Sequence, residues 1–197
     1  MYIDEHLTFD YHTNHIASKL NRSLYCISKV KHFLPPPALR SLYFALFHSH
    51  LSYCPTITGC ASTSNINKIT LLQQKAIRII SNSTYHEHTA PIFKKLQILT
   101  YTKLIHYSKL NFMHSYTYNY CPNSFDNTWT QNIEREDIPY LRNANLLTVP
   151  HPRIELFKKS PLYSLPTLWN LLDDTRFQQC KQTFRICLKN KLIDEPE

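Results

Sequence analysis

The sequence contains a single glycine, Gly59, among its 197 residues. Glycine supplies the positive-φ backbone that tight turns need, and nucleotide-binding α/β folds place several glycines beside the phosphates of their ligand. A phosphate-binding glycine loop is therefore excluded. Leucine and isoleucine are frequent instead, and 12 prolines interrupt the apolar periodicity. We therefore predict a mainly α fold.

Apolar residues at three- and four-residue spacing predict the positions of the helices. The expected helices cover residues 10–34, 37–51, 66–80, 91–97, 101–116, 167–172 and 184–192. Proline sets several of their ends, because it lacks an amide donor and disfavours helix in the residue before it. The three consecutive prolines at 35–37 should end the first helix, and Pro37 should begin the second.

We expect three parts along the chain. Residues 1–9 resemble a strand end and a turn, and such a short strand needs a partner from a larger domain. Residues 10–120 are expected to form a helical domain. Residues 121–197 are expected to form a loop-rich, partly helical C-terminal tail, in which residues 146–149 are compatible with a short strand.

The charge balance favours polyanionic partners. The chain has 22 Lys and Arg against 14 Asp and Glu, a formal net charge of +8 and an isoelectric point near 9.2. This balance favours nucleic acid over a membrane surface, and no apolar segment has the length of a membrane span or signal peptide. The six cysteines form no Cys-x-x-Cys pair, so we expect free thiols in an intracellular protein of the nucleus or cytoplasm.

Basic residues follow the flanks of two predicted helices. In the helix at 66–80, an apolar face is predicted for Ile69, Leu72, Ala76, Ile79 and Ile80. The candidate nucleic-acid-binding residues are Lys68, Lys75 and Arg78 on this helix and Lys19, Arg22 and Lys29 on the helix at 10–34. Cationic helix flanks of this kind hold a nucleic-acid backbone through its phosphates without reading sequence. The competing interpretation is an ordinary solvated basic surface.

No arrangement in the sequence indicates catalysis, a cofactor or a metal. Asp173 and Asp174 are adjacent aspartates, but a two-metal site also needs a tight turn between strands and a third carboxylate. The sequence predicts a solvated turn there. Four potential zinc ligands, His48, His50, Cys54 and Cys60, have spacings that match no regular zinc finger or ribbon. We therefore expect no catalytic residues, no bound metal and no cofactor.

Several segments, taken in order, resemble the C-terminal part of reverse transcriptases from non-LTR (LINE-type) retrotransposons, especially the jockey-like elements. They lie at residues 2–16, 33–43 (FLPPPALRSLY), 49–54 (SHLSYC), 72–80 (LQQKAIRII), 88–99 (HTAPIFKKLQIL), 149–153 (VPHPR), 158–163 (KKSPLY) and 168–170 (LWN). The order and spacing of the segments carry this resemblance, which covers nearly the whole chain. Three positions depart from the family pattern: the residues before Gly59, Leu165 before Pro166, and Asp173-Asp174 after the Trp-Asn pair.

The resemblance implies a truncated protein without polymerase activity. In that family the fingers and the palm, with the catalytic Ala-Asp-Asp motif, precede the position of Met1, and Asp173-Asp174 does not fall where that pair belongs. Residues 1–9 would then be a remnant of the palm edge, and 10–120 a thumb-like helical bundle that holds the template–primer duplex. The implied partners are RNA, an RNA–DNA duplex and possibly a palm-bearing reverse-transcriptase chain. The alternative is a non-functional or protein-interacting helical remnant of a retrotransposon reading frame.

Overall fold

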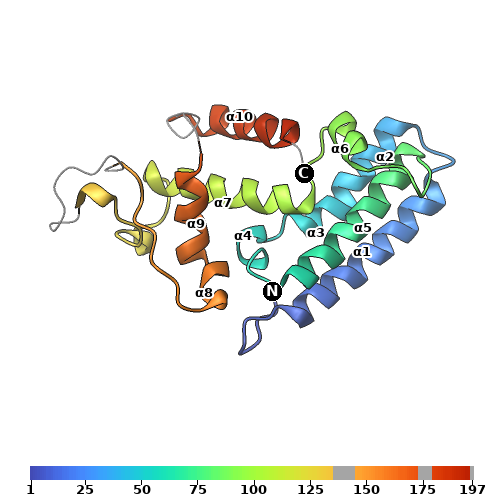
Figure 1. Cartoon of the computed structure of the whole chain (residues 1–197). Helices are drawn as coiled ribbons and strands as arrows, with labels where there is room; N and C mark the ends of the chain where they lie inside the picture. Colours follow the sequence, from blue (N-terminus) through green and yellow to red (C-terminus); the bar gives the residue numbers. More distant parts are fainter. Residues whose placement is uncertain (135–144, 173–178, 196–197) are drawn as a thin grey trace. The chain divides into compact units, whose positions relative to one another are not determined.

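The structure, a computed structural model, describes residues 1–134, 145–172 and 179–195. These residues are mainly helical, and within them no strand forms; the only β-type pairing is an isolated bridge between Gln131 and Leu147 (Figure 1). The predicted mainly α fold is confirmed. Among the described helices, none combines the length and apolarity needed to span a bilayer.

The chain folds into two compact units. The first contains Met1–Ile105 together with Lys191–Glu197, and the second contains His106–Asn190. The division falls within two helices, α7 (Tyr101–Thr117) and α10 (Lys181–Asp194). The boundary that we expected at residue 120 lies inside the second unit.

The first unit is built around two long helices that run side by side in the same direction (Figure 1). Its elements are α1 (Asp10–Val30), α2 (Pro36–Tyr43), the π-helical η1 (Phe44–His48), α3 (Ser49–Leu51), α4 (Pro55–Thr58), α5 (Thr63–Ser81), α6 (Ala90–Leu96) and the first residues of α7. The side-chain amide of Asn65, near the start of α5, donates to Asp10 Oδ1 at 2.7 Å at the start of α1. This bond fixes the two N-terminal ends at the same level.

Local sequence signals explain where these helices begin and end. The Ser62 hydroxyl accepts a hydrogen bond from the Asn65 amide at the start of α5, and Asn82 ends the helix in the left-handed conformation. The first helix was predicted to continue to residue 34 but ends at Val30. Phe33 N–H donates to the Val30 carbonyl in a turn, so the chain leaves the helix before the prolines rather than at them.

The single glycine is needed for close packing and not for its backbone conformation. Gly59 has φ of −70°, whereas the positive-φ positions of the described chain belong to other residues, including Asn82 and Gln97. A Cβ added at Gly59 would lie 2.4 Å from Ile105 Cγ2 and 2.8 Å from the Pro55 carbonyl oxygen. Only glycine therefore allows α4 to approach α7 this closely.

The buried face of α5 differs from the predicted one. Ile69, Leu72, Ala76 and Ile80 are buried as predicted, but Ile79 is only half-buried. Ile77 and the polar Gln73 are buried beside them. The face is therefore rotated toward Gln73, whose side-chain amide donates to Tyr43 Oη at 3.0 Å and to the Leu99 carbonyl at 2.9 Å. Burial also raises the pKa of Tyr43.

Residues 1–9 do not contain the predicted strand. They form a turn in which the Asp4 carboxylate accepts hydrogen bonds from the Thr8 hydroxyl and amide and from the Phe9 amide. The Thr8 hydroxyl lowers the pKa of Asp4. This local bonding satisfies backbone donors that a strand partner would otherwise satisfy.

The second unit contains short helices around Trp129. They are the rest of α7, η2 (Asn123–Phe125), η3 (Asn132–Glu134), α8 (Glu155–Lys159), α9 (Pro161–Asn170) and most of α10. The helix predicted at 167–172 begins earlier, because a proline at 161 suits the first turn. Pro166 lies inside α9 and leaves the Leu162 carbonyl without its helical donor, and the Trp129 indole N–H donates to that carbonyl at 3.3 Å.

The strand considered at 146–149 is reduced to one bridge. Leu147 pairs with Gln131, and its backbone N–H and C=O are both bonded by the Asn170 side-chain amide, at 3.0 and 2.8 Å. The amide of Asn170 thus occupies the place of a neighbouring strand, because it offers one donor and one acceptor to the same residue.

Candidate nucleic-acid interface

The solvent-facing sides of α1 and α5 carry cations and almost no acids. α1 contains Lys19, Arg22 and Lys29, all exposed, and its only acid is Asp10 at the first residue. α5 contains no aspartate or glutamate. Asp10 accepts a hydrogen bond from Asn65, so this one carboxylate lies at the N-terminal ends of the two helices.

Two of the six predicted residues meet in a shallow groove. Arg22 of α1 and Lys68 of α5 line it together with Asn14, Tyr25 and neighbouring small or polar side chains of α1, and its volume is about 740 Å³. None of the lining residues is acidic. Lys68 Nζ donates to Asn14 Oδ1 at 2.5 Å, which holds the lysine over the seam between the two helices. We call this surface the α1/α5 groove.

An exposed aromatic ring lies among the cations of the α1/α5 groove. Tyr25 is 64 % exposed, and Lys29 Nζ lies 5.3 Å from the centre of its ring. The third cation of α1 is therefore held at the groove through Tyr25. Sequence reasoning missed Tyr25 and Asn14, although Tyr25 stands one helical turn after Arg22 and one before Lys29, the spacing that places them on one face.

Lys75 continues the same side of α5. It is exposed and lies two helical turns after Lys68, so the two lysines project on nearly the same side. Their spacing along the helix is about 10 Å at 1.5 Å per residue. The groove and Lys75 together form a basic strip along α5.

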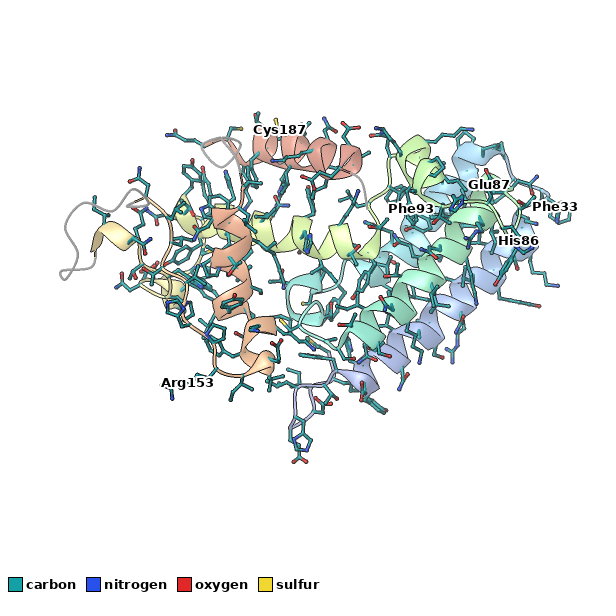
Figure 2. The ribbon with its side chains drawn as sticks, viewed as in Figure 1. Phe33, His86, Glu87, Phe93, Arg153 and Cys187 are labelled. Carbon is teal, nitrogen blue, oxygen red and sulfur yellow. The ribbon has the colours of Figure 1, made fainter. Side chains whose placement is uncertain are left out.

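Arg78, the last predicted residue of α5, makes local contacts instead. Its Nε and Nη2 both donate to the Glu87 carbonyl at 3.3 Å, and its guanidinium lies 5.8 Å from the Tyr85 ring. Glu87 and His86 belong to the loop that follows α5 (Figure 2). Arg78 therefore holds this loop against the helix and does not line the groove.

Lys19 and Lys109 also lie outside the α1/α5 groove. Lys19 lines a different pocket with His15 and His50. Lys109, in the second unit, is 5 % exposed and its Nζ donates to the Ser164 hydroxyl at 3.0 Å. Of the six predicted residues, Arg22, Lys29, Lys68 and Lys75 thus belong to the groove and its strip.

The described part of the chain holds no cluster suited to a metal. No three His, Cys, Asp or Glu side chains come together in that part, and the cysteines there form no disulfide. No three of His48, His50, Cys54 and Cys60 therefore form such a cluster in the described part of the chain. Asp173 and Asp174, which we predicted to be a solvated turn, lie outside the described residues.

The site is therefore an exposed, acid-free basic surface with one aromatic ring, suited to bind an extended polyanion by electrostatic attraction. Comparison with known proteins identifies no relative: no protein-family model, no curated protein and no solved structure matches this chain.

Proposed function

We propose that the first unit binds RNA or an RNA–DNA duplex through the α1/α5 groove without reading its sequence. The observation that carries this proposal is the convergence of Arg22 and Lys68, from two helices, on a groove that no acidic residue lines. Residues that merely keep a surface soluble are usually interspersed with opposite charges. Here the opposite charges are missing.

The arrangement suits phosphates better than base edges. Lysine and arginine on an open surface contact backbone oxygens, and recognition of bases requires side chains that enter a groove of the nucleic acid. Lys68 and Lys75 project from nearly the same side of α5, so both can contact phosphates along one nucleic-acid backbone. Tyr25 adds a ring on which an unpaired base could stack irrespective of its identity.

We further propose that the chain corresponds to the thumb and tail of a non-LTR reverse transcriptase. The order of its motifs supports this, and the mainly helical fold is compatible with it. On this interpretation the chain has no polymerase activity of its own and acts on a template–primer beside a chain that carries the palm. Metal-dependent primer extension by the purified chain alone would contradict this part of the proposal.

The experiment is a binding titration with a labelled RNA–DNA duplex over a series of salt concentrations. Each phosphate contact contributes about 0.7–0.9 to the slope of log K against log salt. The double variant Arg22→Ala/Lys68→Ala should therefore lower the magnitude of the slope by about 1.4–1.8. An unchanged slope would show that the groove does not contact phosphates.

A matched control removes the same charge elsewhere. Lys94 and Lys158 are exposed lysines in ion pairs with Asp194, at 2.7 Å, and with Glu155. The variant Lys94→Ala/Lys158→Ala loses two positive charges, as the groove variant does, and should keep the wild-type slope. If both variants lose affinity equally, binding depends on net charge and not on the groove.

A second candidate function is protein interaction through the second unit. Four apolar side chains on or beside α8 and α9 are substantially exposed: Ile154, Leu156, Leu162 and Leu171. Exposed apolar residues on adjacent elements can form a contact surface. Concentration-dependent association in light scattering, abolished by Leu156→Lys/Leu171→Lys, would support this function. A strictly monomeric chain would exclude self-association.

A further inference from the structure

Histidines from two separate sequence motifs meet in one pocket of the first unit. His12 and His15 come from α1, and His50 comes from α3; together with Lys19 they line a pocket of about 360 Å³. The N-terminal residues 1–2 and Tyr53 complete its wall. The pocket shares no lining residue with the α1/α5 groove.

No acidic residue balances this cationic wall. The lining residues include no aspartate or glutamate. The acids of the adjoining segment contact groups outside the pocket lining: Asp4 accepts from Thr8, Asp10 accepts from Asn65, and Glu5 lies 3.2 Å from His6. A pocket that gathers basic groups without a counter-charge is suited to an anion from outside the protein.

The basic groups of the pocket influence one another. Burial lowers the pKa of His12, and the Met1 amino group, His15 and Lys19 lower it further. Burial also lowers the pKa of His50, with Lys19 and His15 contributing in the same direction. A bound anion would offset this mutual repulsion and favour the charged imidazoles.

His12 also carries a donor that has no acceptor. The ring is 4 % exposed, and its Nδ1 accepts a hydrogen bond from the Tyr2 amide at 3.4 Å. A neutral imidazole with Nδ1 as acceptor carries its proton on Nε2. His12 Nε2 is buried and has no hydrogen-bond partner in the described part of the chain. His12, a lining residue of the pocket, thus has a buried donor without an acceptor, and a phosphate oxygen is a suitable acceptor.

We propose that the pocket formed by His12, His15, Lys19 and His50 binds a phosphate group, more tightly in mildly acidic than in mildly basic solution. Lys19 supplies a charge at both pH values. The half-buried His50 gains a proton as the pH falls and then offers a charged donor to a phosphate oxygen, beside the half-buried His15. The phosphate can belong to a nucleic-acid backbone or to a free phosphate monoester.

Histidine NMR signals of the whole chain, titrated with dimethyl phosphate, test the proposal. This diester keeps one negative charge between pH 6 and pH 8, so any pH dependence belongs to the protein. We expect saturable shifts of the His15 and His50 imidazole signals and a dissociation constant about tenfold lower at pH 6 than at pH 8. Equal shifts with sodium chloride at matched ionic strength, or affinity independent of pH, would overturn the proposal.

Two variants test whether the pH-dependent binding of dimethyl phosphate takes place in this pocket. His15→Gln/His50→Gln should abolish the acid-dependent binding, whereas His86→Gln, which alters an exposed histidine in the loop after α5 (Figure 2), should not. Both variants should keep the wild-type circular dichroism spectrum. If the pocket variant still binds dimethyl phosphate more tightly at pH 6, the site lies elsewhere and the proposal is wrong.

A duplex titration at pH 6 and pH 8 then assigns the source of the phosphate. If the wild type gains affinity at pH 6 and the pocket variant does not, the ligand is a nucleic-acid backbone. Both proteins are also titrated with inorganic phosphate. If their affinities for the duplex change alike with pH, but only the wild type binds inorganic phosphate, the ligand is a free phosphate. Because dimethyl phosphate and inorganic phosphate are tested without nucleic acid, a failure of the α1/α5 groove leaves this result intact.

Discussion

The buried amide of Gln73 offers a specific test of how the first unit is held together. Gln73 is 0 % exposed at the centre of α5, and its Nε2 donates to Tyr43 Oη and to the Leu99 carbonyl at 3.0 and 2.9 Å. Replacing it with leucine keeps a similar volume but leaves two buried acceptors unpaired. An unsatisfied buried group costs about 1–3 kcal/mol. Gln73→Leu also removes the buried Gln73 Oε1, which has no hydrogen-bond partner in the described part of the chain, so we expect a net loss of about 1–3 kcal/mol in the free energy of unfolding.

A double-mutant cycle separates the Tyr43 bond from the rest of that cost. Tyr43→Phe removes the hydroxyl that accepts from Gln73, and Gln73→Leu/Tyr43→Phe replaces both partners with apolar groups. The double variant should be more stable than the sum of the single losses predicts, by about 1 kcal/mol, because the unpaired hydroxyl is gone. Gln74→Leu is the control, since the half-buried Gln74 side chain makes no hydrogen bond within the described part of the chain, and its effect should stay within about 0.5 kcal/mol.

Urea unfolding followed by far-ultraviolet circular dichroism measures these differences. Both tryptophans, Trp129 and Trp169, belong to the second unit, so their fluorescence reports on that unit separately. If Gln73→Leu unfolds at the same urea concentration as Gln74→Leu, or if the cycle shows no coupling, the amide does not hold α5 through these bonds.

Three further changes have defined expected results. Gly59→Ala places a methyl group 2.4 Å from Ile105 Cγ2 and should cost about 1–3 kcal/mol; an unchanged melting temperature would contradict this. The pKa of His12 is lowered in the folded chain, so the unfolded chain binds more protons in acid. The free energy of unfolding should therefore fall as the pH drops below about 6.5. In His12→Gln, the urea midpoints at pH 5 and pH 7 should differ less than in the wild type, and an equal difference would contradict this role. Tyr116 Oη donates to the Trp129 carbonyl at 2.8 Å and accepts from its amide at 3.1 Å. Tyr116→Phe should therefore destabilise the second unit by about 1–3 kcal/mol and alter its tryptophan fluorescence, and unaltered fluorescence unfolding would refute that role.

The long helices were predictable because each has a continuous apolar period and local end signals. For α5, the Ser62 cap and the spacing from Ile69 to Ile80 fix the element without reference to the rest of the chain. The burial of Gln73 was not predictable in this way. Its amide is satisfied by Tyr43 and Leu99, which come from other elements, and no periodicity within α5 reveals such partners.

The candidate site was predictable as a set of cations but not as a geometry. The sequence places Arg22 and Lys68 on separate helices, and only the parallel packing of α1 and α5 brings them into one groove. Arg78 is also a cation on the flank of α5, but the Glu87 carbonyl in the loop that follows α5 accepts hydrogen bonds from its guanidinium. The histidines of α1 and α3 likewise meet only through tertiary packing.

Lysine footprinting tests whether the α1/α5 groove binds nucleic acid, because it shows which lysines the nucleic acid covers. The chain is acetylated with and without a saturating RNA–DNA duplex at low salt, and modification is quantified at each lysine by mass spectrometry. We expect protection of Lys29, Lys68 and Lys75, with Lys158 of the second unit reacting equally in both samples. Equal reactivity of Lys68 and Lys75 with and without bound duplex would contradict it.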